Sequence, residues 1–172
     1  MGAEVTLISG PVSLPTPFGV TRIDVVTADQ MLAACEKLKA VDLAIFCAAV
    51  ADWKIANQAQ QKLKKNDRAD APDLKFASNP DILKTIAGSK QARPKLVVGF
   101  AAETENVIEN AKAKLKSKGC DLIIANDVSQ GVFGTDKNTV HLVSAHGVEA
   151  WPQFSKSEVA RRILEACAKL LK

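Results

Sequence analysis

The stretch Asp42-Leu-Ala-Ile-Phe-Cys-Ala-Ala-Val-Ala-Asp-Trp-Lys-Ile55 predicts both the fold class of this chain and the position of its site. From Leu43 to Cys47 the sequence is an unbroken apolar run, which is typical of a strand covered on both faces in a parallel sheet. The run then changes to Ala48 and Ala49, which have almost no side chain, and to Asp52. Ligands of open α/β sheets bind beyond the carboxyl ends of the strands, where small residues let them approach the backbone. We therefore expect a ligand site here, although a core strand followed by an ordinary loop would give the same pattern.

Length and composition indicate one globular domain, spanning residues 1–172, with 47% hydrophobic and 24% charged residues. No apolar run approaches the ~20 residues needed to cross a membrane, and the N-terminus has no signal-peptide pattern. We therefore expect a cytoplasmic protein that does not bind membranes. The net charge of +4 is modest and few aromatic residues lie among the basic ones. This pattern argues against a nucleic-acid partner and suits a site for a small polyanion.

The four cysteines are far apart in the sequence, and each lies in or directly next to a predicted strand or helix. They are Cys35, Cys47, Cys120 and Cys167. Their spacing fits neither a CxxC pair nor a metal site, so we expect reduced residues of the core.

Strands and helices alternate along the chain, which predicts an α/β fold with a mainly parallel, doubly wound sheet. The expected strands cover residues 5–8, 22–26, 43–47, 74–77, 95–100 and 121–125, followed by an antiparallel edge hairpin at 139–143 and 148–151. Three of the expected helices begin at a capping residue. Thr27 forms a capping box with Gln30, Ser155 forms one with Glu158, and Asn79 is followed by Pro80 in the first turn. A fourth helix is expected from about residue 105 to residue 118, before Gly119.

Three of the expected strands end in a small residue followed by a polar one. The first ends at Ala48, the second reaches Glu103 after Gly99, and the third ends at Asn126 and Asp127. This repetition predicts one ligand cleft shared by the strand ends. Glu103 and Asp127 could hold a metal or accept from a sugar hydroxyl, and each could equally cap a helix or turn.

Residues 54–73 contain few apolar side chains and are expected to form a mobile flap. The flap carries Lys62-Leu-Lys-Lys65, which is either a solvated charge run, the commoner meaning, or a source of positive charge for a bound triphosphate. The helix before Gly119 presents two lysine stripes, Lys114 with Lys118 and Lys112 with Lys116, so at most one pair can face the cleft. Asn79-Pro80-Asp81 could offer backbone donors to a phosphate or simply cap a helix. His141 and His146 are assigned no catalytic role.

Six motifs in register resemble one family across nearly the whole chain. The motifs are Ser9-Gly-Pro-Val-Ser-Leu-Pro15, Ala48-Ala-Val-Ala-Asp-Trp53, Lys62-Leu-Lys-Lys65, Asn79-Pro-Asp-Ile82, Val98-Gly-Phe-Ala-Ala-Glu-Thr104 and Ala125-Asn-Asp-Val128. Together they look like the phosphopantothenoylcysteine synthetase domain of the bacterial bifunctional coenzyme A flavoprotein. The resemblance implies a Rossmann-like three-layer fold and a homodimer.

The same resemblance implies a CTP-dependent ligase that requires Mg²⁺ and acts on 4'-phosphopantothenate and cysteine in coenzyme A biosynthesis. In such enzymes the substrate carboxylate attacks the α-phosphate of CTP, and the cysteine amine then displaces CMP from the acyl-cytidylate. In the family, FMN is bound only by the fused decarboxylase domain. This chain does not contain that domain, which is expected to be a fused or associated partner.

The resemblance also implies roles for individual residues. Contacts to CTP are expected from Phe46, Cys47, Ala48, Asp52, Pro80, Asp81, Ile82, Leu83, Phe100, Lys114 and Lys118. Lys62 would close over the acyl-phosphate region and stabilise developing charge. Ala48 and Ala49 would lie in the catalytic region, with Ala49 against the intermediate. The ligands of magnesium are not implied.

The chain departs from the family pattern at its beginning. The family has a glycine-rich first βα unit upstream, including an Asn-x-Ser-Ser-Gly type stretch that contributes to the acyl-cytidylate step. The opening Gly2-Ala-Glu also resembles the end of a preceding helix. A competing hypothesis is therefore a non-catalytic nucleotide-binding or dimerisation module. A dinucleotide oxidoreductase is disfavoured because no GxGxxG follows a strand.

Overall fold

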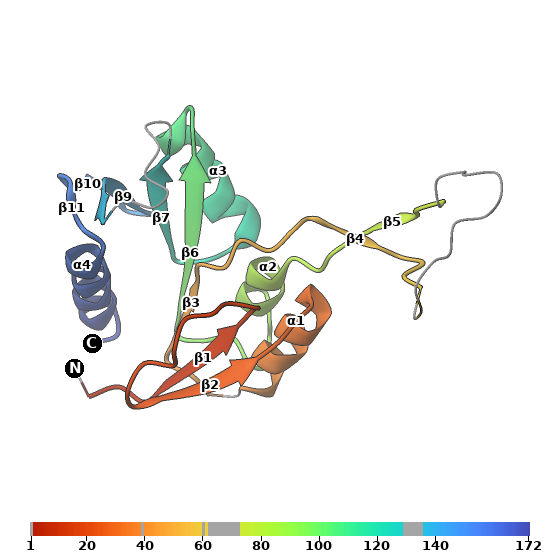
Figure 1. Cartoon of the computed structure of the whole chain (residues 1–172). Helices are drawn as coiled ribbons and strands as arrows, with labels where there is room; N and C mark the ends of the chain where they lie inside the picture. The colour runs from red at the N-terminus through yellow and green to blue at the C-terminus, as the bar shows by residue number, and fades with distance from the viewer. Residues whose placement is uncertain (1, 39, 60, 62–72, 129–135) are drawn as a thin grey trace.

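The computed structural model describes residues 2–38, 40–59, 61, 73–128 and 136–172, and its centre is a five-stranded sheet (Figure 1). The strands, in spatial order, are β10 (Gly147–Ala150), β9 (Val140–Ser144), β7 (Leu122–Asp127), β6 (Leu96–Glu103) and β3 (Leu43–Phe46). β3, β6 and β7 are parallel, whereas β9 and β10 form an antiparallel hairpin at the edge. The predicted α/β class, with its antiparallel edge hairpin, is confirmed.

Helices cover both faces of this sheet and give it two cores. α2 (Ile82–Ala87) and α3 (Val107–Lys118) pack on one face and α4 (Lys156–Leu170) packs on the other, whereas α1 (Ala28–Lys37) contributes to neither core. On β6, Val98 packs with Ile163 of α4, and its neighbour Val97 packs on the other face with Ala111 of α3. Successive strand residues point to opposite faces, so the three-layer prediction is confirmed. In the described part of the chain, no helix has the length and apolar character of a membrane span.

The local helix signals of the sequence are largely correct. Thr27 and Gln30 form the predicted capping box of α1, and Gly119 ends α3 in the left-handed region with φ 68°. Ser155 accepts from the Glu158 amide at the start of α4. The Glu158 carboxylate, however, accepts from Arg161 and Arg162, whose hydrogen bonds lower its pKa to about 2.

The first two strands do not join the central sheet. β1 (Val5–Ser9) and β2 (Val20–Asp24) pair with each other in parallel as a separate two-stranded sheet. The prediction of a buried first strand is wrong, because Val5 and Leu7 are 43% and 38% exposed. β3 was also expected to be covered on both faces, yet its Ile45 is 39% exposed. Both strands border the same open cavity, which explains this exposure.

Two short strands near the borders of the predicted flap form a ribbon that extends away from the body of the domain (Figure 1). β4 (Trp53–Ile55) pairs antiparallel with β5 (Phe76–Ser78), slightly later than the strand predicted at 74–77. Residues 60 and 62–72, including the lysine motif, lie outside the described part. A second short pair, β8 (Lys137–Asn138) with β11 (Phe154–Ser155), precedes α4.

Arg93 ties the ends of two helices to the central sheet. Its guanidinium donates to the Asp121 carboxylate at 2.9 and 3.0 Å and to the carbonyls of Ala87 and Gly119 at 2.9 and 3.3 Å. Asp121 in turn accepts from the Val97 amide at 2.7 Å. Charge-assisted hydrogen bonds of this kind fix geometry as well as adding stability. The ends of α2 and α3 are therefore held next to β6 and β7.

Gly99 lets α2 lie directly against β6. A Cβ atom at this position would be 2.7 Å from Leu83 Cδ2 and 2.9 Å from Ile123 Cδ1. Real Cβ atoms do not approach other carbons so closely, so a side chain here would force the Leu83 and Ile123 side chains to shift. Leu83 lies in α2, and Ile123 belongs to the core of β7.

We predict that Gly99→Ala reduces the free energy of unfolding by roughly 1–3 kcal/mol, the usual cost of overpacking a core. Urea unfolding of the purified chain would measure the change. Gly10→Ala is the matched control, because nothing lies within 4 Å of a Cβ at Gly10. Equal losses in the two variants would contradict a close contact at Gly99.

Candidate functional site

A large cavity of about 1430 Å³ lies between the central sheet and the β1–β2 sheet, with helices around it. Its walls come from β1, β3, the loop that follows β3, the start of α2, and the ends of α3 and α4. The cavity runs along the whole of β3 and includes its carboxyl end, where the stretch at residues 42–55 predicted a ligand site.

Most of the candidate residues meet at this cavity although they are far apart in the sequence. Those that line it are Phe46, Cys47, Ala48, Asp52, Pro80, Asp81, Ile82, Leu83, Phe100, Lys114 and Lys118. Ala49 is exposed and does not line it, because the chain turns there between Ala48 and Val50. Lys62 lies outside the described residues.

Parallel pairing brings the end of β3 next to the middle of β6. Phe46 is in register with Gly99, so Phe100 lies beside the residues that follow β3. The prediction that all four cysteines belong to the core is wrong for Cys47, which is exposed because it follows β3 at the cavity. Burial of Cys120 and Cys167 agrees with the prediction, and Cys35 is half-buried.

Asp81 connects the start of α2 to the end of α3. It is the N-cap of α2, because its Oδ1 accepts from the Lys84 amide at 3.0 Å, and its Oδ2 accepts from Lys118 Nζ. Partial burial opposes ionisation, yet the hydrogen bonds from Lys118 and the Lys84 amide hold the pKa of this carboxyl below its ordinary value. The Asp81 carboxylate therefore occupies the start of α2. Of the two alternatives given for this segment, a phosphate site and a helix cap, the structure shows the cap.

The prediction of Asn79 as the helix cap is wrong. Its side-chain Nδ2 donates to the Ala51 carbonyl at 2.8 Å and, at 3.4 Å, to the Trp53 carbonyl. Its backbone amide donates to the Asp52 carbonyl at 2.8 Å. Asn79 therefore binds the loop after β3 instead of the helix, and Pro80 precedes the cap instead of occupying the first turn. A capping signal in the sequence could not reveal these partners, which are more than 25 residues away.

One lysine stripe of α3 faces the cavity. Lys114 and Lys118 are half-buried and line it, whereas Lys112 and Lys116 are exposed elsewhere on the helix. A spacing of four residues places side chains on one face of a helix. The polar end of the cavity therefore combines two ammonium groups with the carboxyl groups of Asp52 and Asp81, the first of which follows β3.

The ends of β6 and β7 lie apart from the cavity. Glu103 and Asp127 are in register on neighbouring strands, and Glu103 accepts from Asn110 Nδ2 at 3.1 Å. Neither lines the cavity, because β6 continues to Glu103 instead of ending at Phe100. The predicted shared cleft is therefore wrong for these two strand ends. Among the described residues, no three His, Cys, Asp or Glu side chains gather as a metal site would require.

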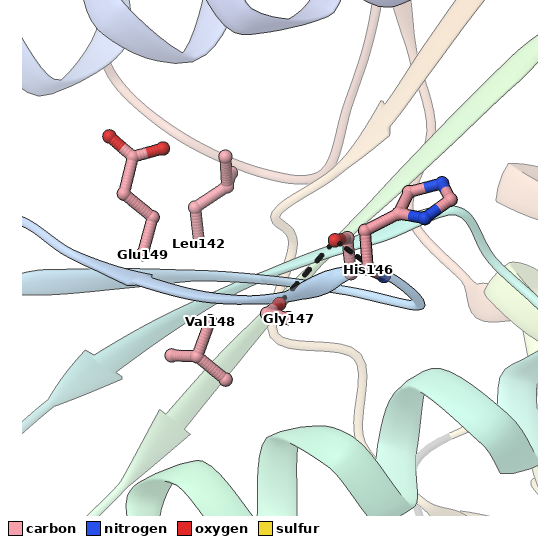
Figure 2. A pocket seen from close by; sticks show the side chains of 6 residues that line it. Leu142, His146, Gly147, Val148 and Glu149 are labelled. Atoms are coloured by element: carbon pink, nitrogen blue, oxygen red, sulfur yellow. Dashed lines mark hydrogen bonds between the residues drawn. The ribbon is translucent and has the colours of Figure 1, made fainter.

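A second, smaller hollow lies at the turn of the β9–β10 hairpin (Figure 2). Figure 2 shows His146 at the turn, with Leu142, Val148 and Glu149 along the hairpin. Ser144 Oγ accepts from the His146 amide at 3.1 Å and donates to the Gly147 carbonyl at 3.4 Å. These are the hydrogen bonds of a tight turn, and none of the residues carried over for CTP lines this hollow.

The end of the large cavity between β1 and β3 is lined mainly by apolar side chains, beside Glu4, Asp42 and Lys95. The apolar residues are Val5 and Leu7 of β1, Ile45 of β3, Leu164 of α4, and Leu171, which caps α4. In the described chain, β1 pairs only with β2, and β3 pairs only with β6. Two strand edges therefore face this end of the cavity, and such edges are ready to pair with another strand.

The structure is a three-layer α/β domain with a large cavity beside β1 and β3. Residues 1–171 match the family described as the DNA/pantothenate metabolism flavoprotein C-terminal domain. The chain belongs to this family.

Three similar proteins illustrate the relationship. The Coenzyme A biosynthesis bifunctional protein CoaBC of Vibrio vulnificus (strain CMCP6) is 43% identical over 175 residues, which cover 99% of this chain and 43% of that protein. A crystal structure of the C-terminal domain of CoaBC superposes with a TM-score of 0.76 at 34% identity, covering 99% of this chain and 76% of that one. A Cab2 variant in complex with phosphopantothenate-cysteine shares the fold, with a TM-score of 0.65 at 17% identity over 89% of this chain and 54% of that one.

We predict that Asp81→Asn destabilises the chain at pH 6 by less than about 1 kcal/mol, because the ion pair with Lys118 is partly exposed and screened. Asn can still cap α2. The folded-state pKa of Asp81 is lowered, so its contribution is present above the ordinary Asp value of about 3.9 and is lost as pH falls through the folded value.

Urea unfolding of both proteins at pH 6 and at pH 2.5 would test this prediction. The stability difference between the wild type and Asp81→Asn should shrink at the lower pH. A difference of the same size at both values would show that the charge of Asp81 contributes nothing.

Proposed function

We propose that this chain is the CTP-dependent ligase domain of coenzyme A biosynthesis, which joins 4'-phosphopantothenate to cysteine. The observation that carries the proposal is that Asp52, Pro80, Phe100 and Lys118 all line one cavity. The relatives named CoaBC and the Cab2 complex with phosphopantothenate-cysteine support the substrate class. The chain spans less than half the length of its CoaBC relative, so the activity concerns this domain alone.

The proposed reaction has two steps. The carboxylate oxygen of 4'-phosphopantothenate attacks the α-phosphorus of CTP. The bond between this phosphorus and the oxygen that bridges to the β-phosphate breaks, and pyrophosphate leaves. The amine of cysteine then attacks the acyl carbon, the acyl–oxygen bond to CMP breaks, and the amine loses a proton. Phosphoryl transfer of this kind depends on alignment and charge neutralisation more than on a nucleophile of the protein.

The polar end of the cavity suits these needs. Lys114 and Lys118 bring two positive charges to one wall, where they can neutralise phosphate oxygens. Ala48 leaves room for the reacting groups next to the backbone. Ala49 is proposed to lie against the reaction intermediate. Lys62, in the lysine motif, is proposed to supply further positive charge in the transition state.

Magnesium is proposed to arrive bound to the phosphates of CTP. Such ions are commonly held by one or two carboxylates together with substrate phosphates. Asp52 at the cavity is a carboxylate of the right type, and the described residues contain no three-ligand cluster that would hold a resident metal. FMN has no role in the chemistry of this domain.

The apolar end of the cavity is proposed to receive a strand of the glycine-rich unit that the family carries upstream. The facing edges of β1 and β3 offer backbone groups, and Val5, Leu7 and Ile45 offer apolar contacts. Filling this place would join β1 and β2 to the central sheet.

CTP with Mg²⁺ should raise the melting temperature of the chain more than ATP with Mg²⁺ does. A ligand that binds only the folded state stabilises it, and the nucleotide that binds more tightly stabilises it more.

Lys118→Met should weaken CTP binding about tenfold or more, which is the cost of one lost charged contact. Lys116→Met, on the exposed side of α3, is the matched control. Isothermal titration calorimetry would give the affinities, and equal losses in both variants would count against the proposal.

The chain is also proposed to form a homodimer, and the β4–β5 ribbon offers a surface for it. Trp53, Ile55 and Phe76 are 63%, 41% and 68% exposed. Trp53 and Ile55 share one face of β4, and Ile55 is in register with Phe76, so the three side chains lie on the same face of the ribbon. An exposed apolar face of this kind is typical of an interface.

Phe76→Lys should weaken the dimer at least tenfold, because it places a charge in an apolar interface. Sedimentation equilibrium would measure the dissociation constant. Phe18→Lys is a matched control, since Phe18 is a fully exposed phenylalanine on a different part of the chain. A monomeric wild type, or a dimer weakened equally by both changes, would remove the ribbon as the interface.

A further inference from the structure

Asn79 makes an unusual set of hydrogen bonds at the candidate site. It lies between β5 and α2 and also lines the cavity. The carbonyls of three successive residues, Ala51, Asp52 and Trp53, accept from this one residue. Two of these bonds come from the side-chain amide and one from the backbone amide.

These bonds connect two neighbouring segments that both line the cavity. One segment is the loop from Ala48 to Asp52, which follows β3 and leads into β4, and the bond from the Asn79 amide to the Asp52 carbonyl continues the β4–β5 pairing. The other is the start of α2, where Asp81 accepts from Lys118. Because Asn79 is only two residues from Asp81, its hydrogen bonds join the loop that carries Asp52 to the segment that carries the Asp81–Lys118 pair.

The neighbouring proline makes this connection stiff. Pro80 restricts the backbone of Asn79 to extended conformations and has no amide of its own to compete for the same carbonyls. The side chain of Asn79 has its donor directed at the loop, whereas capping of α2 is provided by Asp81. The two polar residues that flank Pro80 thus have separate tasks.

We propose that Asn79 is a positioning residue of the nucleotide site. Its side-chain amide holds the Ala48–Asp52 loop against the start of α2, so that the loop backbone and Asp52 are pre-arranged to meet the ligand together with Lys118. The identity of the ligand as CTP rests on the proposed function, but the bracing of the loop does not. Pre-arrangement reduces the ordering cost of binding and therefore raises affinity.

The chain contains a matched control for this residue. Asn57 also joins two segments, since its Nδ2 donates to the Asp73 carbonyl at 2.8 Å and its Oδ1 accepts from the Lys75 amide at 2.9 Å. It lies beyond the paired strands of the ribbon and does not line the cavity. Replacing Asn57 therefore removes a similar pair of bonds without touching the loop after β3.

The test compares Asn79→Ala and Asn79→Asp with Asn57→Ala. Asn79→Asp keeps the shape of the side chain but cannot donate to the Ala51 carbonyl. The first measurement, made without nucleotide, is the backbone order parameter of residues 48–52 by NMR relaxation. We expect values near 0.85 in the wild type and below about 0.6 in both Asn79 variants. Asn57→Ala should leave these values unchanged.

The second measurement is the dissociation constant for CTP with Mg²⁺ by calorimetry. Both Asn79 variants should bind about tenfold more weakly, whereas Asn57→Ala should stay within about twofold of the wild type. Two variants are used because one of them could fail to fold, which circular dichroism would reveal.

The two measurements separate the possible failures. Unchanged order parameters in the Asn79 variants would overturn the positioning role, whatever the ligand is. A mobile loop with unchanged CTP affinity would also overturn it, because bracing would then have no effect on the site. If the wild type does not bind CTP, the proposed function fails, and the order parameters still decide whether Asn79 holds the loop.

Discussion

The close contact of α2 with β6 at Gly99 is the constraint on which the site depends. With no side chain at Gly99, Leu83 of α2 can lie against the strand, and this brings the start of the helix to the end of β3. Arg93 and Asp121 then fix the other ends of α2 and α3 next to the sheet. The Asp81–Lys118 pair and the Ala48–Asp52 loop meet at one cavity beside these packed elements.

The cavity has two chemically different ends, and each follows from the elements around it. At the polar end, the start of α2 and one stripe of α3 contribute Asp81, Lys114 and Lys118. At the apolar end, β1 and β3 present strand edges together with apolar side chains. A triphosphate needs the first kind of surface, and a strand of polypeptide needs the second. One continuous cavity can therefore serve both the proposed nucleotide and the proposed upstream segment.

Local patterns in the sequence predicted the fold class, most strand positions, the capping box at Thr27 and the left-handed Gly119. These features depend on neighbouring residues, so a short window contains the information. The errors arose where distant residues decide the outcome. Asn79 is a residue type that often caps helices, but here it donates to the carbonyls of Ala51 and Asp52 instead. The burial of β1 and β3 depends on which strands pair with them, and apolar content alone could not show their exposed edges. The stripe argument for Lys114 and Lys118 placed them correctly on one helix face, because that relation is also local.

The most direct measurement of the central claim is a crystal structure of the chain grown with CTP and Mg²⁺. The account predicts a triphosphate within hydrogen-bond distance of Lys114 and Lys118, with the nucleotide between the end of β3 and the start of α2. Nucleotide density at the β9–β10 hollow, or at any place away from Asp52 and Phe100, would contradict it.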